Sequence, residues 1–176
     1  LRDYIQVIGV SIPELLPMMG FSQHNPHHHL DVWEHTLETL DHVPNQLIPR
    51  LIMLFHDIGK PNCFTIDEEG IGHFYGHNKE SALITENILK RLKYDKDTIK
   101  KIVTVIRHHD GEILAEAKYV KRWLNRIGEE NFRLLLSIKR ADALGQSPEY
   151  VEEKLAYLNK LEDILKEVIE EEQCFS

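Results

Sequence analysis

Helical periodicity is the feature of this sequence that most restricts its fold. Apolar residues recur at three- and four-residue steps, and the alternation of apolar and polar residues that is typical of strands is nearly absent. One exception is the segment CFTIDEEGIGHFYG, whose two short β-prone arms flank Glu68, Glu69 and Gly70 and predict a hairpin. The sequence therefore predicts an all-α fold with one small β-hairpin. We expect the helices near residues 11–19, 31–42, 47–58, 78–92, 96–109, 117–127, 129–144 and 148–172.

Signals at the helix ends support these positions. The words SIPE (residues 11–14) and DVWE (residues 31–34) both have the form of an N-terminal capping box. In SPEY, Ser147 is expected to cap a long helix with Pro148 in its first turn. Gly59 and Pro61 are expected to end the helix over residues 47–58.

Charge is distributed unevenly along the 176 residues. The net charge is −8, yet residues 90–140 carry 14 Lys and Arg against 7 Asp and Glu. Such a basic segment can attract a phosphate-bearing ligand, whereas the total charge argues against non-specific binding to nucleic acid, and no DNA partner is expected. No apolar run approaches the roughly 20 residues that span a bilayer, so no membrane association is expected.

Two cysteines, Cys63 and Cys174, lie far apart and form no CxxC pattern. We expect free thiols in a reducing compartment, and hence a cytoplasmic protein. The first residue is Leu, which is compatible with a fragment of a longer protein. A monomer and a homodimer are both compatible with the sequence.

Histidines are concentrated in one part of the chain. All 11 lie between His24 and His109, and in the word LFHDIGK an apolar run leads directly into His56 and Asp57. Burying two polar groups without partners is costly, so each requires another side chain or a metal ion. A single histidine of this kind is more often satisfied by a neighbour or exposed, but the ordered set indicates a metal site. The set, expected at helix ends or on apolar helices, comprises His35, His56, Asp57, His77, His108, His109 and Asp142.

The order of these residues resembles a known signature. His35, then His56-Asp57, then Asp142 is similar to the pattern of the HD-domain metal-dependent phosphohydrolases. The words NPHHHLDVWEHTLETL, LFHDIGKP, GHNKESA and ADALGQSPEYVEEKL resemble the HD domain of bacterial tRNA nucleotidyltransferases (CCA-adding enzymes), over about residues 10–160. The resemblance implies an HD-domain-like helical bundle. We expect one domain over residues 1–176, with a core at about 20–146 and a long C-terminal helix at about 148–172.

The resemblance also implies roles for individual residues. One divalent ion (Mn, Fe, Ni, Co or Mg) would be held by His35, His56, Asp57 and Asp142. A second ion would share Asp57 and add His77, His108 and His109. Asp57 would be catalytic. From its position three residues beyond Asp57, Lys60 is expected to bind the charge of a phosphate and to take part in catalysis, with a solvated loop lysine as the alternative. Further substrate contacts are expected from His29 and Arg140. Arg140 is the weakest of these, because two positions before Asp142 on a helix it points away from that residue.

One part of the nucleotidyltransferase pattern is missing. Such enzymes carry Gly-Gly or Gly-Ser followed by a D-x-D carboxylate pair, whereas the D-x-D here is Asp95-Lys96-Asp97 without a glycine motif. This segment is instead expected to start a helix, where acidic residues complement the macrodipole. We therefore expect no nucleotide addition by this chain.

Three functions fit the expected site. The first is a phosphodiesterase or phosphatase acting on a nucleotide or RNA-terminal phosphate, which the complete ligand set favours. The second is a regulatory or RNA- or nucleotide-binding HD module with little turnover. The third is an iron-dependent oxygenase on the same scaffold.

Overall fold

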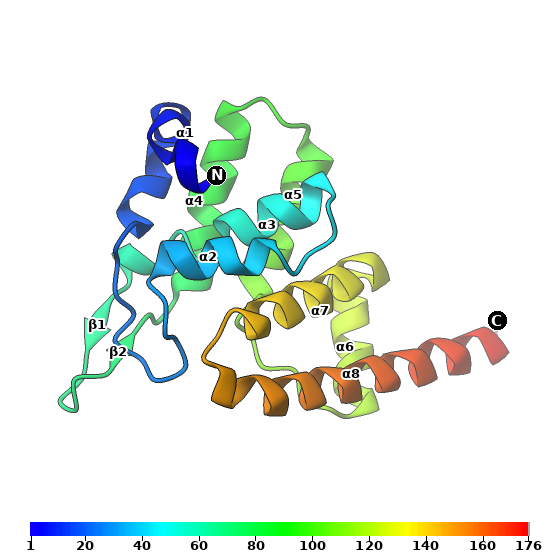
Figure 1. The fold of residues 1–176 in the computed structure, drawn as a ribbon. Coiled ribbons are helices and arrows are strands. Elements are labelled where there is room, and N and C mark those ends of the chain that lie inside the picture. Colours follow the sequence, from blue (N-terminus) through cyan, green and yellow to red (C-terminus); the bar gives the residue numbers. More distant parts are fainter. Residues whose placement is uncertain (176) are drawn as a thin grey trace.

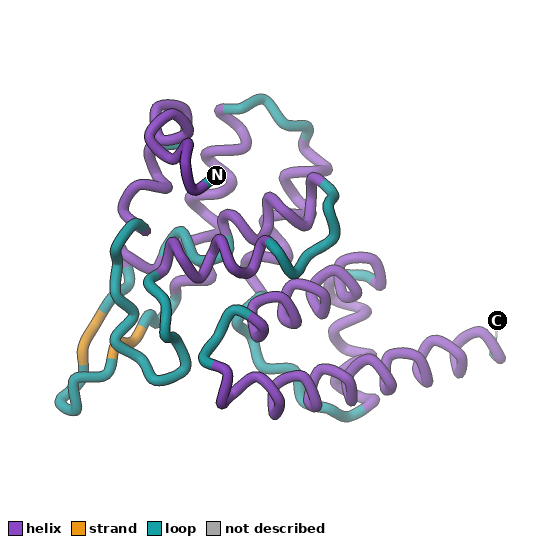
Figure 2. The backbone as a smooth tube through the Cα atoms, in the orientation of Figure 1, coloured by secondary structure: helices purple, strands orange, loops and turns teal. Residues whose placement is uncertain are grey.

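The structure is a computed structural model that describes residues 1–175. Helices dominate it, and a short two-stranded sheet lies at one edge (Figure 2). The predicted all-α class with one small hairpin is therefore confirmed. In chain order the elements are η1 (Arg2–Tyr4), α1 (Ile5–Ser11), η2 (Pro13–Met18), α2 (Val32–Leu40), α3 (Leu47–Phe55), η3 (Lys60–Asn62), β1 (Thr65–Ile66), β2 (Gly72–His73), α4 (His77–Arg91), α5 (Lys96–His108), α6 (Ala117–Ile127), α7 (Glu129–Leu144) and α8 (Pro148–Cys174).

Helix α3 is the element around which the site is assembled. It packs against α2, α4, α5 and α7, and Ile52, Met53 and Phe55 on it are completely buried (Figure 1). A short helix that is apolar on most sides is stable only when neighbours surround it. Its C-terminal end therefore delivers the following residues, His56 and Asp57, into the interior.

Helix α8 packs along one side of the molecule. Leu158, Leu161, Leu165 and Val168 face α6 and α7 and are almost completely buried. The apolar stripe of α8 therefore packs within the chain. The last turns extend beyond the other helices (Figure 1).

The hairpin lies next to the loop that precedes α2. Its strands are antiparallel, with Thr65 opposite His73 and Ile66 opposite Gly72. A backbone hydrogen bond joins the hairpin to that loop, because Gly72 N–H donates to His24 O. The hairpin is thereby held beside the residues that lead to His35.

Some expected helix ends are wrong. Ser11 does not cap a helix: it ends α1, a helix that the sequence reading missed, and η2 starts at Pro13 without a side-chain cap. Proline disfavours the helical conformation in the residue before it, so Ile12 separates the two segments. Ser147 occupies the N-cap position of α8, but its side chain makes no capping bond. Asp31 and Asp95 do cap α2 and α5 through their side chains.

Helix α3 ends at Phe55, three residues before the expected end at residue 58. Tight turns follow, in which Ile58 N–H donates to Phe55 O and Lys60 N–H donates to Asp57 O. His56 and Asp57 therefore lie just past the helix. Within residues 1–175, none of the helices combines the length and apolar character that crossing a bilayer requires.

Candidate metal centre

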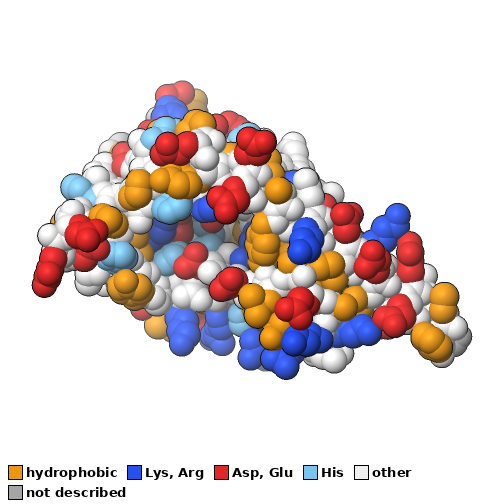
Figure 3. Space-filling model, turned by 90° about the horizontal axis from the view of Figure 1, so that it is seen from below, with side chains coloured by type: hydrophobic (Ala, Val, Ile, Leu, Met, Phe, Trp, Pro, Cys, Tyr) orange, Lys and Arg blue, Asp and Glu red, His pale blue; other side chains and the backbone are white. Residues whose placement is uncertain are grey.

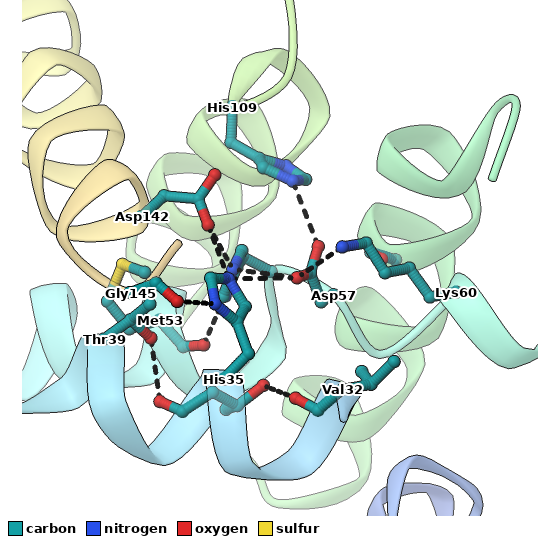
Figure 4. Close-up of polar contacts among 12 residues, drawn as sticks. Val32, His35, Thr39, Met53, Asp57, Lys60, His109, Asp142 and Gly145 are labelled. Atoms are coloured by element: carbon teal, nitrogen blue, oxygen red, sulfur yellow. Dashed lines mark hydrogen bonds and ion pairs between the residues drawn. The ribbon is translucent and has the colours of Figure 1, made fainter. Parts of the chain in front are cut away.

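Two sets of side chains with ligand atoms within 4.8 Å of one another lie at the centre of the helices. They come from α2, from the turn after α3, from the start of α4, from the end of α5 and from α7. Figure 4 shows several of them pointing toward Asp57. The first set comprises His35, His56, Asp57 and Asp142, and the second comprises Asp57, His77 and His109.

The first set surrounds one oxygen of each carboxylate. His35 Nε2 lies 2.7 Å from Asp142 Oδ1 and 3.6 Å from Asp57 Oδ2. His56 Nε2 lies 3.2 Å from each of the same two oxygens. Both histidines and Asp57 are almost inaccessible to solvent, while the Asp142 side chain is 20% exposed. This is a buried two-nitrogen, two-oxygen arrangement with one open side.

The second set uses the other oxygen of Asp57. His77 Nε2 lies 3.3 Å and His109 Nε2 lies 3.5 Å from Asp57 Oδ1, and the two ring nitrogens are 3.2 Å apart. Asp57 therefore belongs to both sets, with one carboxylate oxygen in each.

Each of the four histidines is oriented by a backbone carbonyl. The Nδ1 atoms of His56, His77 and His109 lie 2.6–2.9 Å from the carbonyl oxygen three residues earlier. His35 Nδ1 lies 2.9 Å from Gly145 O. An Nδ1–H donated to a carbonyl leaves the Nε2 lone pair directed inward, which is the usual outer support of a metal-binding histidine.

This arrangement fits a divalent cation. With Nδ1–H bound to a carbonyl, a neutral His35 presents a lone pair at Nε2, and Asp142 Oδ1, also an acceptor, lies 2.7 Å away. Two acceptors at that distance require positive charge, either a proton on the ring or a metal ion nearby. Imidazole nitrogens with carboxylate oxygens are ligands for Mn, Fe, Co and Ni.

Without an ion, protons provide that charge. Burial disfavours a charged His56, but Asp57 and Asp142 outweigh burial and raise the pKa of His56 to about 10. Burial likewise opposes ionisation of the carboxyls, yet the pKa of Asp57 is lowered well below its usual range by His56 and Lys60. His35 and His56 do the same for the pKa of Asp142. Burial lowers the pKa of His109. A metal ion would therefore replace a bound proton.

Lys60 is part of this centre. It is 5% exposed, its Nζ lies 3.0 Å from Asp57 Oδ2, and it donates to Gln23 Oε1 at 2.7 Å. The ring of Phe74 lies 5.2 Å from the ammonium group. The alternative of a solvated loop lysine is therefore excluded by its burial.

Three residues named from the sequence lie elsewhere. His108 packs its ring against Trp123, with centroids 5.1 Å apart, and is in neither ligand set. Arg140 donates to Asn159 and pairs with Glu162, both on α8. His29 is exposed. Within the part of the chain that the structure describes, none of these three residues contacts the two ligand sets.

Two further residues line the site. His28, not His29, has its ring 5.1 Å from that of His35, and burial lowers its pKa to about 3. Gln23, the partner of Lys60, is 2% exposed. Both lie in a loop without periodicity, so the sequence does not indicate where their side chains point.

The fold and the site together define the class. Residues 27–146 match the family model described as HD domain, and the chain belongs to this family. Similar curated proteins extend the earlier resemblance. The CC-adding tRNA nucleotidyltransferase of Thermus thermophilus is 30% identical over 182 residues, which cover 100% of this chain and 41% of the relative. The A-adding tRNA nucleotidyltransferase of Deinococcus radiodurans is 31% identical over 172 residues, covering 93% and 39%.

A further relative is the Multifunctional CCA protein of Azoarcus sp., 30% identical over 151 residues that cover 78% of this chain and 35% of the relative. The chain thus spans about two fifths, or less, of the length of these relatives. Asp95, the first residue of the D-x-D word, caps α5 by accepting from Thr98 N–H and does not lie in the ligand sets.

Proposed function

We propose that this chain is a metal-dependent phosphohydrolase that acts on a nucleotide or RNA-terminal phosphate. The observation that carries the proposal is the convergence of four Nε2 atoms on the carboxylates of Asp57 and Asp142, each imidazole being oriented by a carbonyl. Support for RNA as a substrate class comes from the relatives, whose names refer to tRNA.

The proposed ligands follow the two sets. His35, His56, Asp57 and Asp142 would hold one ion, and Asp57 with His77 and His109 a second. A divalent ion here would supply a water of lowered pKa and would neutralise charge on a phosphoryl oxygen. The chain's own contribution is to hold the donor atoms in place and to limit their access to solvent.

Lys60 is the proposed contact for the phosphate. Its ammonium group has three N–H donors, and two are directed at Asp57 and Gln23. It lines a cavity of about 290 Å³ together with Asp57 and Asp142, so the remaining N–H can reach a ligand there. Its fixed position would bind a phosphoryl oxygen next to the cluster with little loss of side-chain entropy.

In the proposed reaction a water oxygen forms a bond to phosphorus. The bond between phosphorus and the ester oxygen breaks, and the departing oxygen takes up a proton. No redox partner is required. Phosphate or a phosphomonoester and an alcohol are the products.

The test is a screen of phosphoester hydrolysis with purified protein, in which released phosphate and the nucleotide products are both measured. Substrates would include a nucleoside monophosphate, a 2′,3′-cyclic nucleotide and an oligoribonucleotide with a 3′-phosphate, each with Mg, Mn, Co or Ni. Metal-dependent hydrolysis of at least one, abolished by chelator, is expected.

The alternatives give different results. A binding module would bind these ligands without hydrolysis under any metal, which would overturn the proposal. An iron-dependent oxygenase would consume oxygen with Fe and release no phosphate, which would do the same.

A further inference from the structure

The cavity at the metal centre continues toward α8. It shares His109, Asp110, Asp142 and Gln146 with a neighbouring cavity of about 220 Å³. That cavity in turn shares lining residues, including Lys139 and Lys154, with a third of about 490 Å³. The face that contains α8 and the hairpin is visibly hollowed, with histidine side chains in the hollow (Figure 3). A ligand at the cluster therefore has room to extend along α8.

Two lysines line this extension, and they differ in what they bind. Lys139 Nζ donates to the carbonyl oxygens of His109, at 3.0 Å, and Gly111, at 2.5 Å. Its ammonium group is thereby used to hold the loop after α5. Lys154 donates to the amide oxygen of Gln146, which is itself buried, and no ion pair with a carboxylate is formed by Lys154 within the described chain.

Lys154 is therefore a half-buried cation with a neutral partner. Burial is the largest influence on the pKa of Lys154 and lowers it, while the carboxylates of Asp142 and Asp110 act in the opposite direction without pairing directly with the ammonium group. Such a group is stabilised by an anion, because a charge-assisted hydrogen bond offsets the loss of hydration. Asp110 lines all three cavities but is exposed, and its carboxylate lies 3.9 Å from His77 Nδ1.

Hydrogen bonds and a ring contact hold the rim of the extension on both sides of Lys154. Tyr157 OH accepts from Ile113 N–H and donates to Ile113 O. On the other side the rings of His27 and Tyr150 lie 4.0 Å apart, and Ser147 N–H donates to His27 O. The lysine thus lines the third cavity together with the aromatic side chains of His27, Tyr150 and Tyr157.

We propose that Lys154 binds a second phosphate group of the substrate, apart from the phosphate at the cluster. This inference rests on the proposed function and narrows its substrate class to nucleotides that carry two phosphates. Two sources share this chemistry: a free nucleoside bisphosphate, and an RNA end whose terminal phosphate is followed by an internal phosphodiester.

The test measures binding and hydrolysis separately. Binding of adenosine 3′,5′-bisphosphate, of a trinucleotide with a 3′-phosphate and of AMP would be measured by calorimetry on the purified chain, with chelator present to prevent turnover. The wild-type chain is expected to bind at least one of the two-phosphate ligands on the order of tenfold more tightly than AMP. Whichever of the two binds more tightly identifies the source.

Variants assign that preference to Lys154. Lys154→Gln should abolish it, Lys154→Arg should retain most of it, and Lys160→Gln, an exposed lysine on the same helix, should leave it unchanged. Thermal melts of the variants would show that each folds.

A preference that is absent in the wild type, or that persists in Lys154→Gln, would overturn this inference. Phosphate release with added metal separates it from the proposed function. Hydrolysis without a Lys154-dependent preference would leave the proposed function standing and remove the second phosphate site. A Lys154-dependent preference without any hydrolysis would leave the second phosphate site standing and remove the proposed function.

Discussion

The two ligand sets around Asp57 differ in the number of their members and in the elements that supply them. The first set has four members, and they come from α2, the turn after α3, and α7. The second has three members, and its two histidines stand at facing ends of α4 and α5, which pack on each other. The comparison indicates that the first set depends on the long-range packing of three helices, whereas the second depends on one helix pair joined by a short connection.

Asp57 is the element that the two sets share. Its Oδ2 faces His35, His56 and Lys60, and its Oδ1 faces His77 and His109. Changes at Asp57 should therefore affect both sets, while changes at the other ligands should separate them.

Asp57→Asn is expected to have the largest effect. An amide supplies one weak ligand oxygen instead of two charged ones, so both ions should be lost. Phosphate release should fall by more than about 100-fold, beyond what the loss of an outer-shell partner costs. Elemental analysis and phosphate release would measure this. Asp97→Asn, at an exposed position on α5, is the matched control, and metal retained by Asp57→Asn would contradict the shared role.

His109→Ala should remove the second set only. Metal content should fall by about one equivalent, with the first ion retained, because His35, His56 and Asp142 are unchanged. His108→Ala, one residue earlier and packed on Trp123, is the control and should keep full metal content. Equal metal content and activity in both variants would mean that the chain uses one ion.

Gly145→Ala should weaken the first set alone. A Cβ at this position would lie 2.7 Å from Thr39 Cγ2 and 3.0 Å from His35 Nδ1, so either the ring or the carbonyl that holds it must move. We expect metal affinity of the first site to fall about 10- to 100-fold. Gly111→Ala, whose Cβ would meet no atom closer than 3.4 Å, is the control in the same competition titration with a metal indicator. Unchanged affinity in Gly145→Ala would show that this carbonyl is dispensable.

The smallest effect concerns acid stability beside the first set. The folded chain keeps His28 neutral, with its pKa lowered to about 3, whereas an unfolded histidine titrates near 6.5. Below pH 6.5 the unfolded state therefore binds more protons than the folded state. The contribution of His28 to stability is complete above about pH 6.5 and declines as the pH falls toward 3. Each unit of pKa difference corresponds to about 1.4 kcal/mol.

His28→Asn should therefore lose less stability between pH 7 and pH 4.5 than the wild type, by about 2–3 kcal/mol in chelated protein. Denaturant unfolding at the two pH values would measure the difference. His29→Asn, its exposed neighbour, should behave as wild type. The same acid loss in all three chains would mean that His28 is not held neutral by the fold.

Much of the site could be predicted because its residues lie in ordered patterns. His56 and Asp57 follow an apolar run that had to be buried, and Asp142 lies on a helix with buried neighbours. The choice between His108 and His109 was also present in the sequence, because Ile102, Val105 and Ile106 are the buried face of α5 and His109 continues it. His108 falls on a different face.

Other parts could not be predicted. The burial of Lys60 depends on its contacts with Gln23 and Asp57, and Gln23 lies in a loop whose path is set by the hairpin and by α8. Arg140 was the weakest of the expected contacts, because helix geometry turns it away from Asp142, and it pairs with Glu162 on α8. Loop residues and the outer partners of ligands require tertiary structure.

The carbonyl anchors of the imidazoles have a consequence for how such centres vary. Three of the rings are held by main-chain oxygens of Met53, Phe74 and Ile106, and any amino acid in those places would offer the same atom. Side chains there are free to change as the surrounding packing requires, without releasing the rings. A search for outer partners by residue type would therefore overlook them, although they orient three of the four imidazoles in the two ligand sets.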